Sequence, residues 1–112
     1  MTRITSHVLD TSVGRPATGL AVRLERIGGA ENPKPVATAV TDGEGRVRDW
    51  LPSELPGGRY RIVFETGPWF QAAGRETLYP EVCIDVEVSD AMPHYHLPLL
   101  LSPFGYSTYR GS

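Results

Sequence analysis

Hydrophobic and polar side chains alternate along several short segments of the chain, which is the spacing of a β-strand with one buried face. The alternation is clearest at residues 59–66 (RYRIVFET) and 81–90 (EVCIDVEVSD). In the second segment, valine or isoleucine occupies every even position from 82 to 88, and Cys83, Asp85 and Glu87 lie between them. Further strands are predicted at residues 4–10, 20–27, 36–41, 94–102 and 105–111.

Turn-forming residues separate these segments, and a single stretch favours a helix. The Asp-Gly pair of residues 42–45 (DGEG) suits a turn that needs a left-handed residue. Residues 67–76 (GPWFQAAGRE) predict the helix, with Pro68 near its start. Short strands, frequent turns and one short helix predict an all-β fold, an antiparallel β-sandwich of about seven or eight strands. Because no internal repeat is present, we expect a single domain over residues 1–112.

Residues 96–102 (HLPLLLS) break the alternation, because no polar side chain separates their leucines. One face of this strand can pack inside the sandwich. The other needs a covering element, since a contiguous exposed apolar patch promotes association. Pro98 has no backbone N–H and therefore belongs at a strand edge or a bulge. Self-association is the economical interpretation, and the alternative is a strand buried between the sandwich and the helix of one subunit.

Composition narrows the class of protein. A hydrophobic fraction of 40% and a charged fraction of 21% are those of a globular chain. The net charge of −2 and the scattered Lys and Arg argue against a nucleic-acid or anionic-membrane partner. No run of about twenty apolar residues is present, and residues 1–10 do not resemble a secretion signal, so we expect a cytoplasmic protein. The single cysteine, Cys83, excludes an internal disulfide and a multi-cysteine metal site, and a structural role is favoured for it.

The candidates for chemistry are basic side chains. If Ile4 and Val8 face the core, His7 points outward with Thr5. Two more histidines share one face of a strand, one arginine follows the turn at residues 42–45, and two polar residues stand at the terminus: His94, His96, Arg46, Arg110 and Ser112. A lone histidine on a strand is more often a hydrogen-bonded residue than a catalyst. Three histidines can bind zinc, but no accompanying ligand spacing supports a metal site. Trp50 and Trp69 are interpreted as core or interface aromatics.

Five segments, taken together, resemble the 5-hydroxyisourate hydrolases, the transthyretin-related enzymes of urate breakdown. They are SHVLDTSVGRPATGLAVRL (residues 6–24), TDGEGR (41–46), YRIVFETGPWF (60–70), YPEVCIDVEV (79–88) and HYHLPLLLSPFGYSTYRGS (94–112). The likeness covers nearly the whole chain in order, and the terminal Tyr-Arg-Gly-Ser is its most specific mark. It implies a transthyretin-like sandwich of eight strands with one short helix. It also implies a homotetramer with active sites in a channel at the dimer–dimer interface.

The resemblance also implies a set of site residues. The catalytic residues would be His7, Arg46, His96 and Ser112, and the substrate-binding residues would be His7, Arg46, Tyr109, Arg110 and Gly111. The implied reaction opens the ring of 5-hydroxyisourate by attack of water on an amide carbonyl, with the two histidines as base and acid in either order. No metal or organic cofactor is implied. Transthyretin shares this sandwich and only carries ligands, so a carrier is the alternative function. It has lysine, glutamate and threonine in place of His7, Arg46 and His96, so at these positions the sequence resembles the hydrolase.

Overall fold

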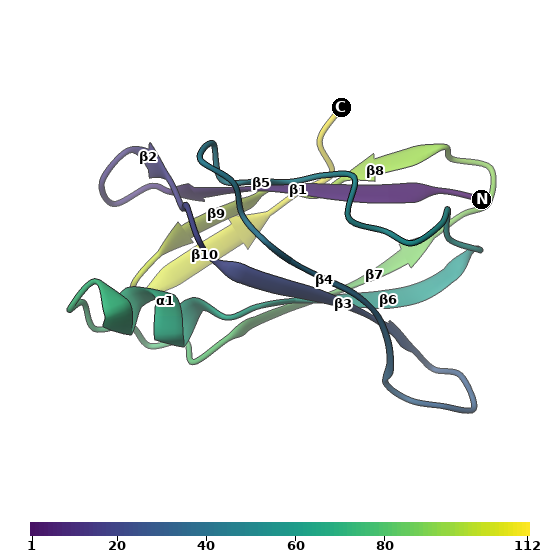
Figure 1. Cartoon of the computed structure of the whole chain (residues 1–112), viewed down its shortest axis with the longest axis horizontal. Helices are drawn as coiled ribbons and strands as arrows, with labels where there is room; N and C mark the ends of the chain where they lie inside the picture. Colours follow the sequence, from purple (N-terminus) through teal and green to yellow (C-terminus); the bar gives the residue numbers. More distant parts are fainter.

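The computed structural model describes residues 1–112 and contains ten strands and one short helix, arranged as two facing sheets (Figure 1). In the first sheet, β1 pairs with every other strand except β10, which pairs with β9. Its strands are β1 (Arg3–Asp10), β2 (Arg15–Pro16), β5 (Arg46–Val47), β8 (His94–His96), β9 (Leu99–Ser102) and β10 (Gly105–Thr108). The second sheet has the order β4 (Lys34–Val40), β3 (Ala21–Ile27), β6 (Gly58–Phe64) and β7 (Val82–Val88). The predicted all-β sandwich with one short helix is confirmed.

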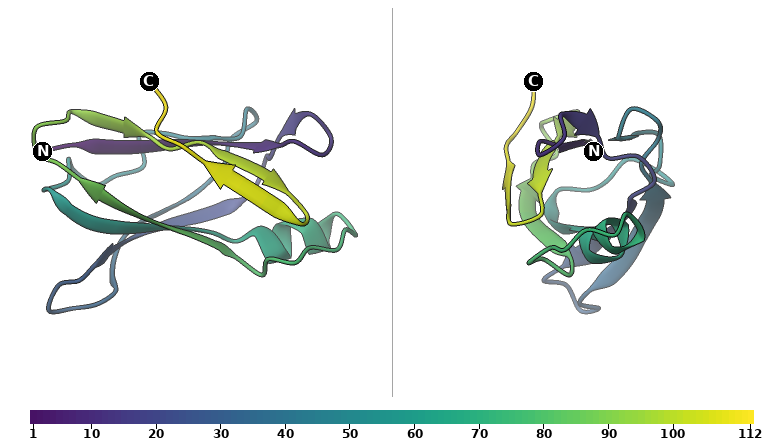
Figure 2. Two further views of the ribbon diagram at one scale, coloured as in Figure 1. Left: turned by 180° about the vertical axis from the view of Figure 1, so that it is seen from behind. Right: turned by 90° about the vertical axis from the view of Figure 1, so that its left-hand side faces the viewer.

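Most strand pairs are antiparallel, as expected, but β1 pairs in parallel with both β8 and β9. The chain leaves the second sheet after β7 and crosses to the first sheet, where it runs alongside β1 in the same direction (Figure 2). Pro98 falls in the short break between β8 and β9, where the missing backbone N–H costs no ladder hydrogen bond. The segment predicted as one strand at residues 94–102 is therefore two.

The core lies between the two sheets and follows the predicted alternation. Tyr60, Ile62 and Phe64 on β6 are each at most 1% exposed. Val63 departs from the pattern, because it is also only 1% exposed although it points to the outer face of the sheet. Its register neighbours there are Arg23 and Cys83.

Helix α1 (Thr66–Ala72) begins one residue before the predicted segment and ends earlier. Gly74, with a φ of 70°, ends the helical path, because a left-handed residue closes a helix and glycine adopts that conformation without strain. The side chain of Phe70 is fully buried and fixes the helix across one end of the sandwich. This helix has seven residues, and the chain contains no helix that is long and apolar enough to cross a membrane.

The apolar strand near the end of the chain has one buried and one partly covered face. Leu99 and Leu101 are fully buried, which confirms the expectation for the inner face. Leu100 points outward beside Leu9 and is half-buried. The chain end is held in place, since β10 pairs with β9 and the backbone N–H of Gly111 donates to the carbonyl oxygen of His96 at 2.7 Å.

Candidate active site

The outer face of the first sheet collects the predicted site residues around β1. Along this strand Ile4, Ser6, Val8 and Asp10 are buried, so Thr5 and His7 face outward, as the alternation predicts. On one side of β1, His96 lies in register with Thr5; on the other, Arg46 of β5 lies in register with His7. Residues from three distant segments therefore meet on one surface.

The turn at residues 42–45 places both Arg46 and His7. One carboxylate oxygen of Asp42 accepts hydrogen bonds from the backbone N–H groups of Glu44 and Arg46, each at 2.9 Å. The left-handed residue is Gly45, with a φ of 76°, and not the glycine of the Asp-Gly pair. A Cβ atom on Gly45 would lie 2.4 Å from the carbonyl oxygen of Val8, so the turn can pack against β1 only with glycine here.

The hydrogen bond of His7 defines its tautomer. Its Nε2 atom lies 2.7 Å from the carbonyl oxygen of Glu44. A carbonyl oxygen can only accept, so Nε2 carries the proton and donates it. In the neutral ring, the lone pair is therefore on Nδ1, which is the atom of His7 able to take up a proton.

His96 is held by two hydrogen bonds and by the close approach of Gly111 to its ring. Its Nδ1 atom lies 2.9 Å from the hydroxyl oxygen of Thr5, and its backbone carbonyl accepts from Gly111. A Cβ atom on Gly111 would lie 2.7 Å from Cδ2 of the His96 ring, so glycine is required for this approach. The Nε2 atom of His96 has no hydrogen-bond partner, and no unpaired side-chain nitrogen is buried. Nε2 is therefore the nitrogen open to a ligand.

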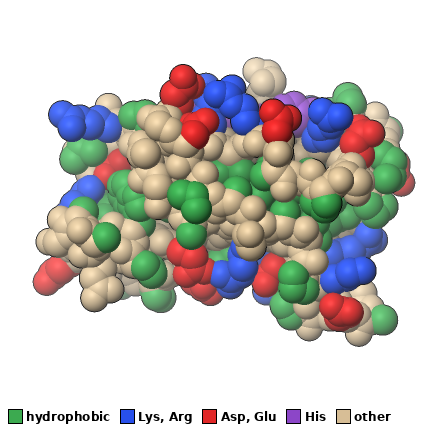
Figure 3. Space-filling model, viewed as in Figure 1, with side chains coloured by type: hydrophobic (Ala, Val, Ile, Leu, Met, Phe, Trp, Pro, Cys, Tyr) green, Lys and Arg blue, Asp and Glu red, His purple; other side chains and the backbone are tan.

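A groove of about 430 Å³ runs over this surface. It is lined by Thr5, Ser6, Arg46, Val47, Arg48, His94, His96 and Ser112. At the top of the molecule, on the side where Figure 1 places the C-terminus, a histidine side chain lies among basic and acidic side chains (Figure 3). The groove thus contains three of the four predicted catalytic residues, and the fourth, His7, lies beside Arg46 in the strand register.

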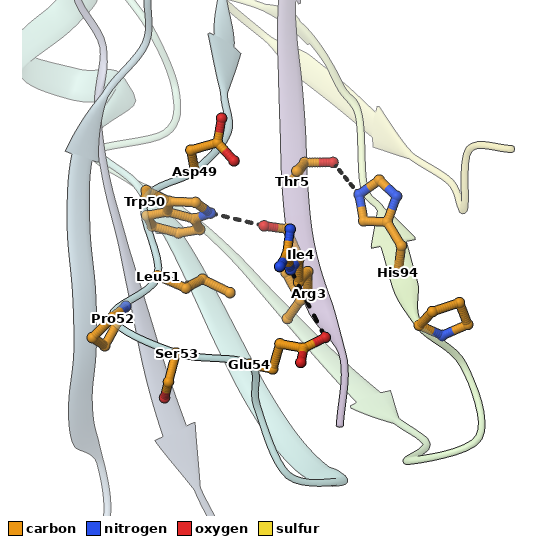
Figure 4. Close-up of a pocket in the computed structure, with 11 residues that line it drawn as sticks. Arg3, Ile4, Thr5, Asp49, Trp50, Leu51, Pro52, Ser53, Glu54 and His94 are labelled. Carbon is orange, nitrogen blue, oxygen red and sulfur yellow. Dashed lines mark hydrogen bonds and ion pairs between the residues drawn. The ribbon is translucent and has the colours of Figure 1, made fainter.

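A larger hollow of about 700 Å³ adjoins the groove and shares Thr5 and His94 with it (Figure 4). Its opposite wall is the loop of residues 49–54, in which the indole N–H of Trp50 donates to the carbonyl oxygen of Ile4 at 2.8 Å. The smaller groove carries most of the imidazole and guanidinium groups. We therefore identify the groove, rather than the hollow, as the candidate active site.

Of the five predicted binding residues, only Arg46 lines the groove itself. His7 and Gly111 lie beside its lining residues Arg46 and His96, and Tyr109 and Arg110 lie outside it. Tyr109 is 54% exposed. The guanidinium of Arg110 lies 5.8 Å above the ring of Tyr95. Within one chain, the terminal segment therefore contributes Gly111 and Ser112 to the surface around His96, whereas Tyr109 and Arg110 point elsewhere.

Electrostatics favour a neutral His96. Burial lowers the pKa of His96, and the nearby positive charge of Arg46 and the imidazoles of His94 and His7 lower it further. The guanidinium of Arg46 reaches a carboxylate of Glu44 at 3.6 Å, whereas no histidine of the chain forms an ion pair. A neutral imidazole at neutral pH can accept a proton, and an adjacent arginine can stabilise negative charge.

The predicted site residues included neither Thr5 nor His94, although His94 was one of the candidates for chemistry. The alternation placed Thr5 on the face of His7, and His94 on the face of His96, but neither pattern shows that the two strands are neighbours. That pairing joins residues 89 positions apart, His94 and Thr5. The signal that would have identified Thr5 is a hydroxyl residue two positions from a histidine, which places both side chains on the same predicted outer face.

The remaining candidates lie apart from the groove or serve the fold. No group of three or more His, Cys, Asp or Glu side chains is placed to hold a metal ion. Cys83 is a largely exposed residue on β7, but its thiol is partly buried. This partial burial and the neighbouring Glu81 raise the pKa of Cys83, which disfavours the nucleophilic thiolate. The indole N–H of Trp69 donates to the carbonyl oxygen of Thr18 at 2.8 Å, and both tryptophans pack against the core.

Comparisons with known proteins agree with the architecture and the sequence. The model of the HIUase/Transthyretin family matches residues 4–111. A 5-hydroxyisourate hydrolase of Caulobacter vibrioides is 43% identical over 116 aligned positions, covering 100% of both chains. A solved Klebsiella pneumoniae 5-hydroxyisourate hydrolase is 42% identical, covers 100% of both chains and gives a TM-score of 0.89. Sea bream transthyretin, solved with thyroxine, is 28% identical over 96% of this chain and 93% of its own, with a TM-score of 0.88. The chain belongs to the HIUase/transthyretin family.

Proposed function

We propose that this protein hydrolyses 5-hydroxyisourate to 2-oxo-4-hydroxy-4-carboxy-5-ureidoimidazoline, a step of urate catabolism. The observation that carries the proposal is that His7, Arg46 and His96 meet on one outer face of the first sheet. A relative named 5-hydroxyisourate hydrolase, which aligns with the full chain, supports it. Water adds its oxygen to a ring amide carbonyl, the C–N bond of the ring breaks, and the departing nitrogen takes a proton. The reaction needs a base, an acid and positive charge near the developing oxyanion.

The hydrogen bonds of the site support specific atoms for these roles. The free nitrogens are Nδ1 of His7 and Nε2 of His96, because the opposite nitrogen of each ring is already engaged. One of them removes the proton from water and the other supplies a proton to the departing nitrogen, in either order. The planar guanidinium of Arg46 offers donors to the substrate oxygens and to the oxyanion.

The chain terminus is proposed to complete the site. Ser112 lines the groove and brings a hydroxyl and the terminal carboxylate to it, while Gly111 allows the backbone to approach His96. Tyr109 and Arg110 are proposed to contact substrate in the assembled protein. Deletion of residues 109–112, or a bulky C-terminal tag, should remove most turnover but leave folding intact. An N-terminally tagged protein is the control, and equal activity of the two would contradict this role for the terminus.

We further propose a homotetramer whose sites lie at the dimer–dimer interface. The outward side chain of Leu100 is only half-buried, and Phe104 and Tyr106, beside the free edge of β10, are 69% and 42% exposed. A second copy of the chain would cover these apolar groups. Sedimentation or light scattering should report a tetramer, and Leu100→Asp should split or precipitate it. A fully active monomer at micromolar concentration would overturn this assembly.

The decisive assay is the decay of freshly made 5-hydroxyisourate, followed by ultraviolet absorbance with and without the protein. Hydrolysis predicts faster decay in proportion to protein concentration. A transthyretin-like carrier predicts ligand binding in the same place, by calorimetry with an aromatic ligand, and an unchanged rate of decay. An unchanged rate with well-folded, tetrameric protein would refute the proposed activity.

A further inference from the structure

The hydroxyl of Thr5 joins two imidazoles. Its oxygen lies 2.7 Å from Nε2 of His94 and 2.9 Å from Nδ1 of His96. A threonine hydroxyl has one proton to donate, so it can donate to only one of these nitrogens. The other nitrogen must therefore carry a proton and donate it to the Thr5 oxygen. The tautomer of one histidine thus depends on the tautomer of the other.

The side chain of Thr5 has no hydrogen-bond partner other than the two imidazoles, so the bridge has two arrangements in which the hydroxyl proton is used, and they have opposite consequences for the candidate site. In the first, His96 donates from Nδ1 to Thr5, Thr5 donates to His94, and the open Nε2 of neutral His96 is a proton acceptor. In the second, His94 donates from Nε2 to Thr5, Thr5 donates to His96 Nδ1, and Nε2 of His96 carries a proton. The direction of the Thr5 hydroxyl therefore decides whether His96 presents a base or an acid.

We propose that Thr5 is a positioning residue that couples the tautomers of His94 and His96, and that His96, Thr5 and His94 form a proton path from the groove to the adjoining hollow. The role of this path in turnover rests on the proposed hydrolase function. The coupling itself is a property of the hydrogen-bonded chain and does not depend on the substrate.

The surroundings of the bridge suit a path that ends in solvent. His94 is exposed and lies at the junction of the groove and the hollow, and Figure 4 shows its ring turned toward Thr5. The hollow is open beside it, and two of its charged side chains, Arg3 and Glu54, pair with each other at 3.8 Å, while the third, Asp49, forms no hydrogen bond or ion pair with His94. A proton that reaches His94 can therefore pass to water.

The groups around His96 disfavour a doubly protonated ring. The titratable and charged groups that face His96 or share its groove come from four places in the chain. They are His7 on β1, Arg46 on β5 with Arg48 directly after it, His94 on the same strand as His96, and the terminal carboxylate of Ser112. Burial lowers the pKa of His96, and the positive charge of Arg46, and of either neighbouring imidazole when that ring is protonated, lowers it further. Only the Thr5 hydroxyl contacts Nδ1 of His96 directly.

The protons balance over one cycle. When Nε2 of His96 takes a proton from the attacking water, the Nδ1 proton moves to the Thr5 oxygen, the hydroxyl proton moves to Nε2 of His94, and His94 releases its Nδ1 proton to solvent. His96 is then neutral with a proton on Nε2, and His7 supplies the proton of the departing nitrogen. In the reverse assignment, Nε2 of His96 donates to the departing nitrogen, each transfer along the bridge runs backwards, and His94 takes one proton from solvent. Exchange of the Nε2 proton with water in the groove restores the starting tautomer before the next turnover.

The coupling is tested first without substrate, by nitrogen-15 NMR of the histidine rings, whose shifts report the tautomer. His94→Gln should change the tautomer population of His96 in the native background and in Thr5→Ser, which keeps the hydroxyl. In Thr5→Val, which removes the hydroxyl, His94→Gln should leave His96 unchanged. Equal effects in all three backgrounds would overturn the coupling. Thr5→Ala removes the same hydroxyl if the valine variant does not fold.

Kinetics test the path separately. Thr5→Val should lower kcat by about tenfold or more with a small change in KM, because a histidine in the wrong tautomer cannot exchange its proton. The solvent deuterium isotope effect should also change, and Thr5→Ser should restore both. Native kcat in Thr5→Val would refute the path. If the unaltered protein has no hydrolase activity, the proposed function fails, while the NMR result still decides the coupling.

Discussion

The outer faces of the two sheets both carry charged side chains, but their partners differ. On the second sheet, three arginines meet carboxylates of the strands or of the residues next to them: Arg23 with Glu25, Glu65 and Glu81, Arg59 with Glu87, and Arg61 with Asp85. On the first sheet, the imidazoles meet neutral partners, which are the carbonyl of Glu44 and the hydroxyl of Thr5. On the second sheet these arginines are therefore paired with carboxylates, whereas on the first sheet His7 and His96 each keep one ring nitrogen free of hydrogen bonds.

The pKa directions express the same contrast. On the second sheet, the hydrogen bonds between Arg61 and Asp85 raise the pKa of Arg61 and lower the pKa of Asp85, so both charged forms are stabilised. On the first sheet, burial and neighbouring positive charge lower the pKa of His96, so its neutral form is stabilised. Groups fixed in one charge state serve structure, and a group whose proton is easily exchanged suits catalysis.

Removal of the imidazole of His7 or His96, or of the guanidinium of Arg46, should have the largest effect on activity. His7→Ala, His96→Ala and Arg46→Ala are each expected to lower kcat/KM by about a hundredfold or more, the scale of a lost acid–base or oxyanion group. The variants should keep their fold, because the outer face contributes little to the core. The measurement is decay of 5-hydroxyisourate beside thermal unfolding, with Arg59→Ala on the second sheet as the matched control. Near-native turnover in both histidine variants would refute the assignment of His7 and His96 as catalytic base and acid.

A smaller effect is expected from adding one methyl group beside His96. In Gly111→Ala, the new Cβ would lie 2.7 Å from Cδ2 of the His96 ring, so the ring or the terminus must move. We expect a loss of activity of about tenfold, since misplaced catalytic groups lose much of their effect. Gly29→Ala is the control, because its Cβ would have no heavy atom closer than 3.8 Å. Equal activity of the two variants would show that the terminus does not position His96.

How far the sequence predicts the molecule differs between these regions. Period-two alternation gave the inner and outer faces of β1 and β6, because burial of one strand face is a local property of the pattern. The parallel pairing of β1 with β8 was not predictable, since it depends on how the chain crosses from one sheet to the other. The bridging position of Thr5 follows only from that pairing. The left-handed conformation at Gly45 was likewise set by the close approach of Val8.

The site face should also make stability depend on pH. Because the pKa of His96 is lowered in the folded protein, the unfolded chain takes up this proton at a higher pH than the folded chain does. The unfolded state then binds more protons, so stability is full above about pH 6.5 and falls as the pH drops below it. Urea unfolding between pH 5 and 8 measures this slope. The slope should be shallower in His96→Gln, and an identical slope would contradict the lowered pKa.

The smallest effect is expected on the opposite sheet. Arg23→Gln removes the cation that meets Glu25, Glu65 and Glu81, while it keeps much of the aliphatic stem beside Val63 in the strand register. The side chain of Arg23 is 38% exposed, so solvent screens these pairs, and the expected loss is about 1 kcal/mol or less of unfolding free energy. Repulsion among the three remaining carboxylates adds to the loss at low salt and should be reduced by added sodium chloride.

Hydrolysis by Arg23→Gln should stay within about twofold of the unaltered protein, because Arg23 lies on the other sheet and shares no hydrogen bond with β1 or β8. Urea unfolding at low and high salt, measured beside turnover of 5-hydroxyisourate, separates the two quantities. A tenfold loss of turnover in a folded Arg23→Gln protein would mean that the outer face of the second sheet is coupled to the site. In that case the division between a structural face and a chemical face would be wrong.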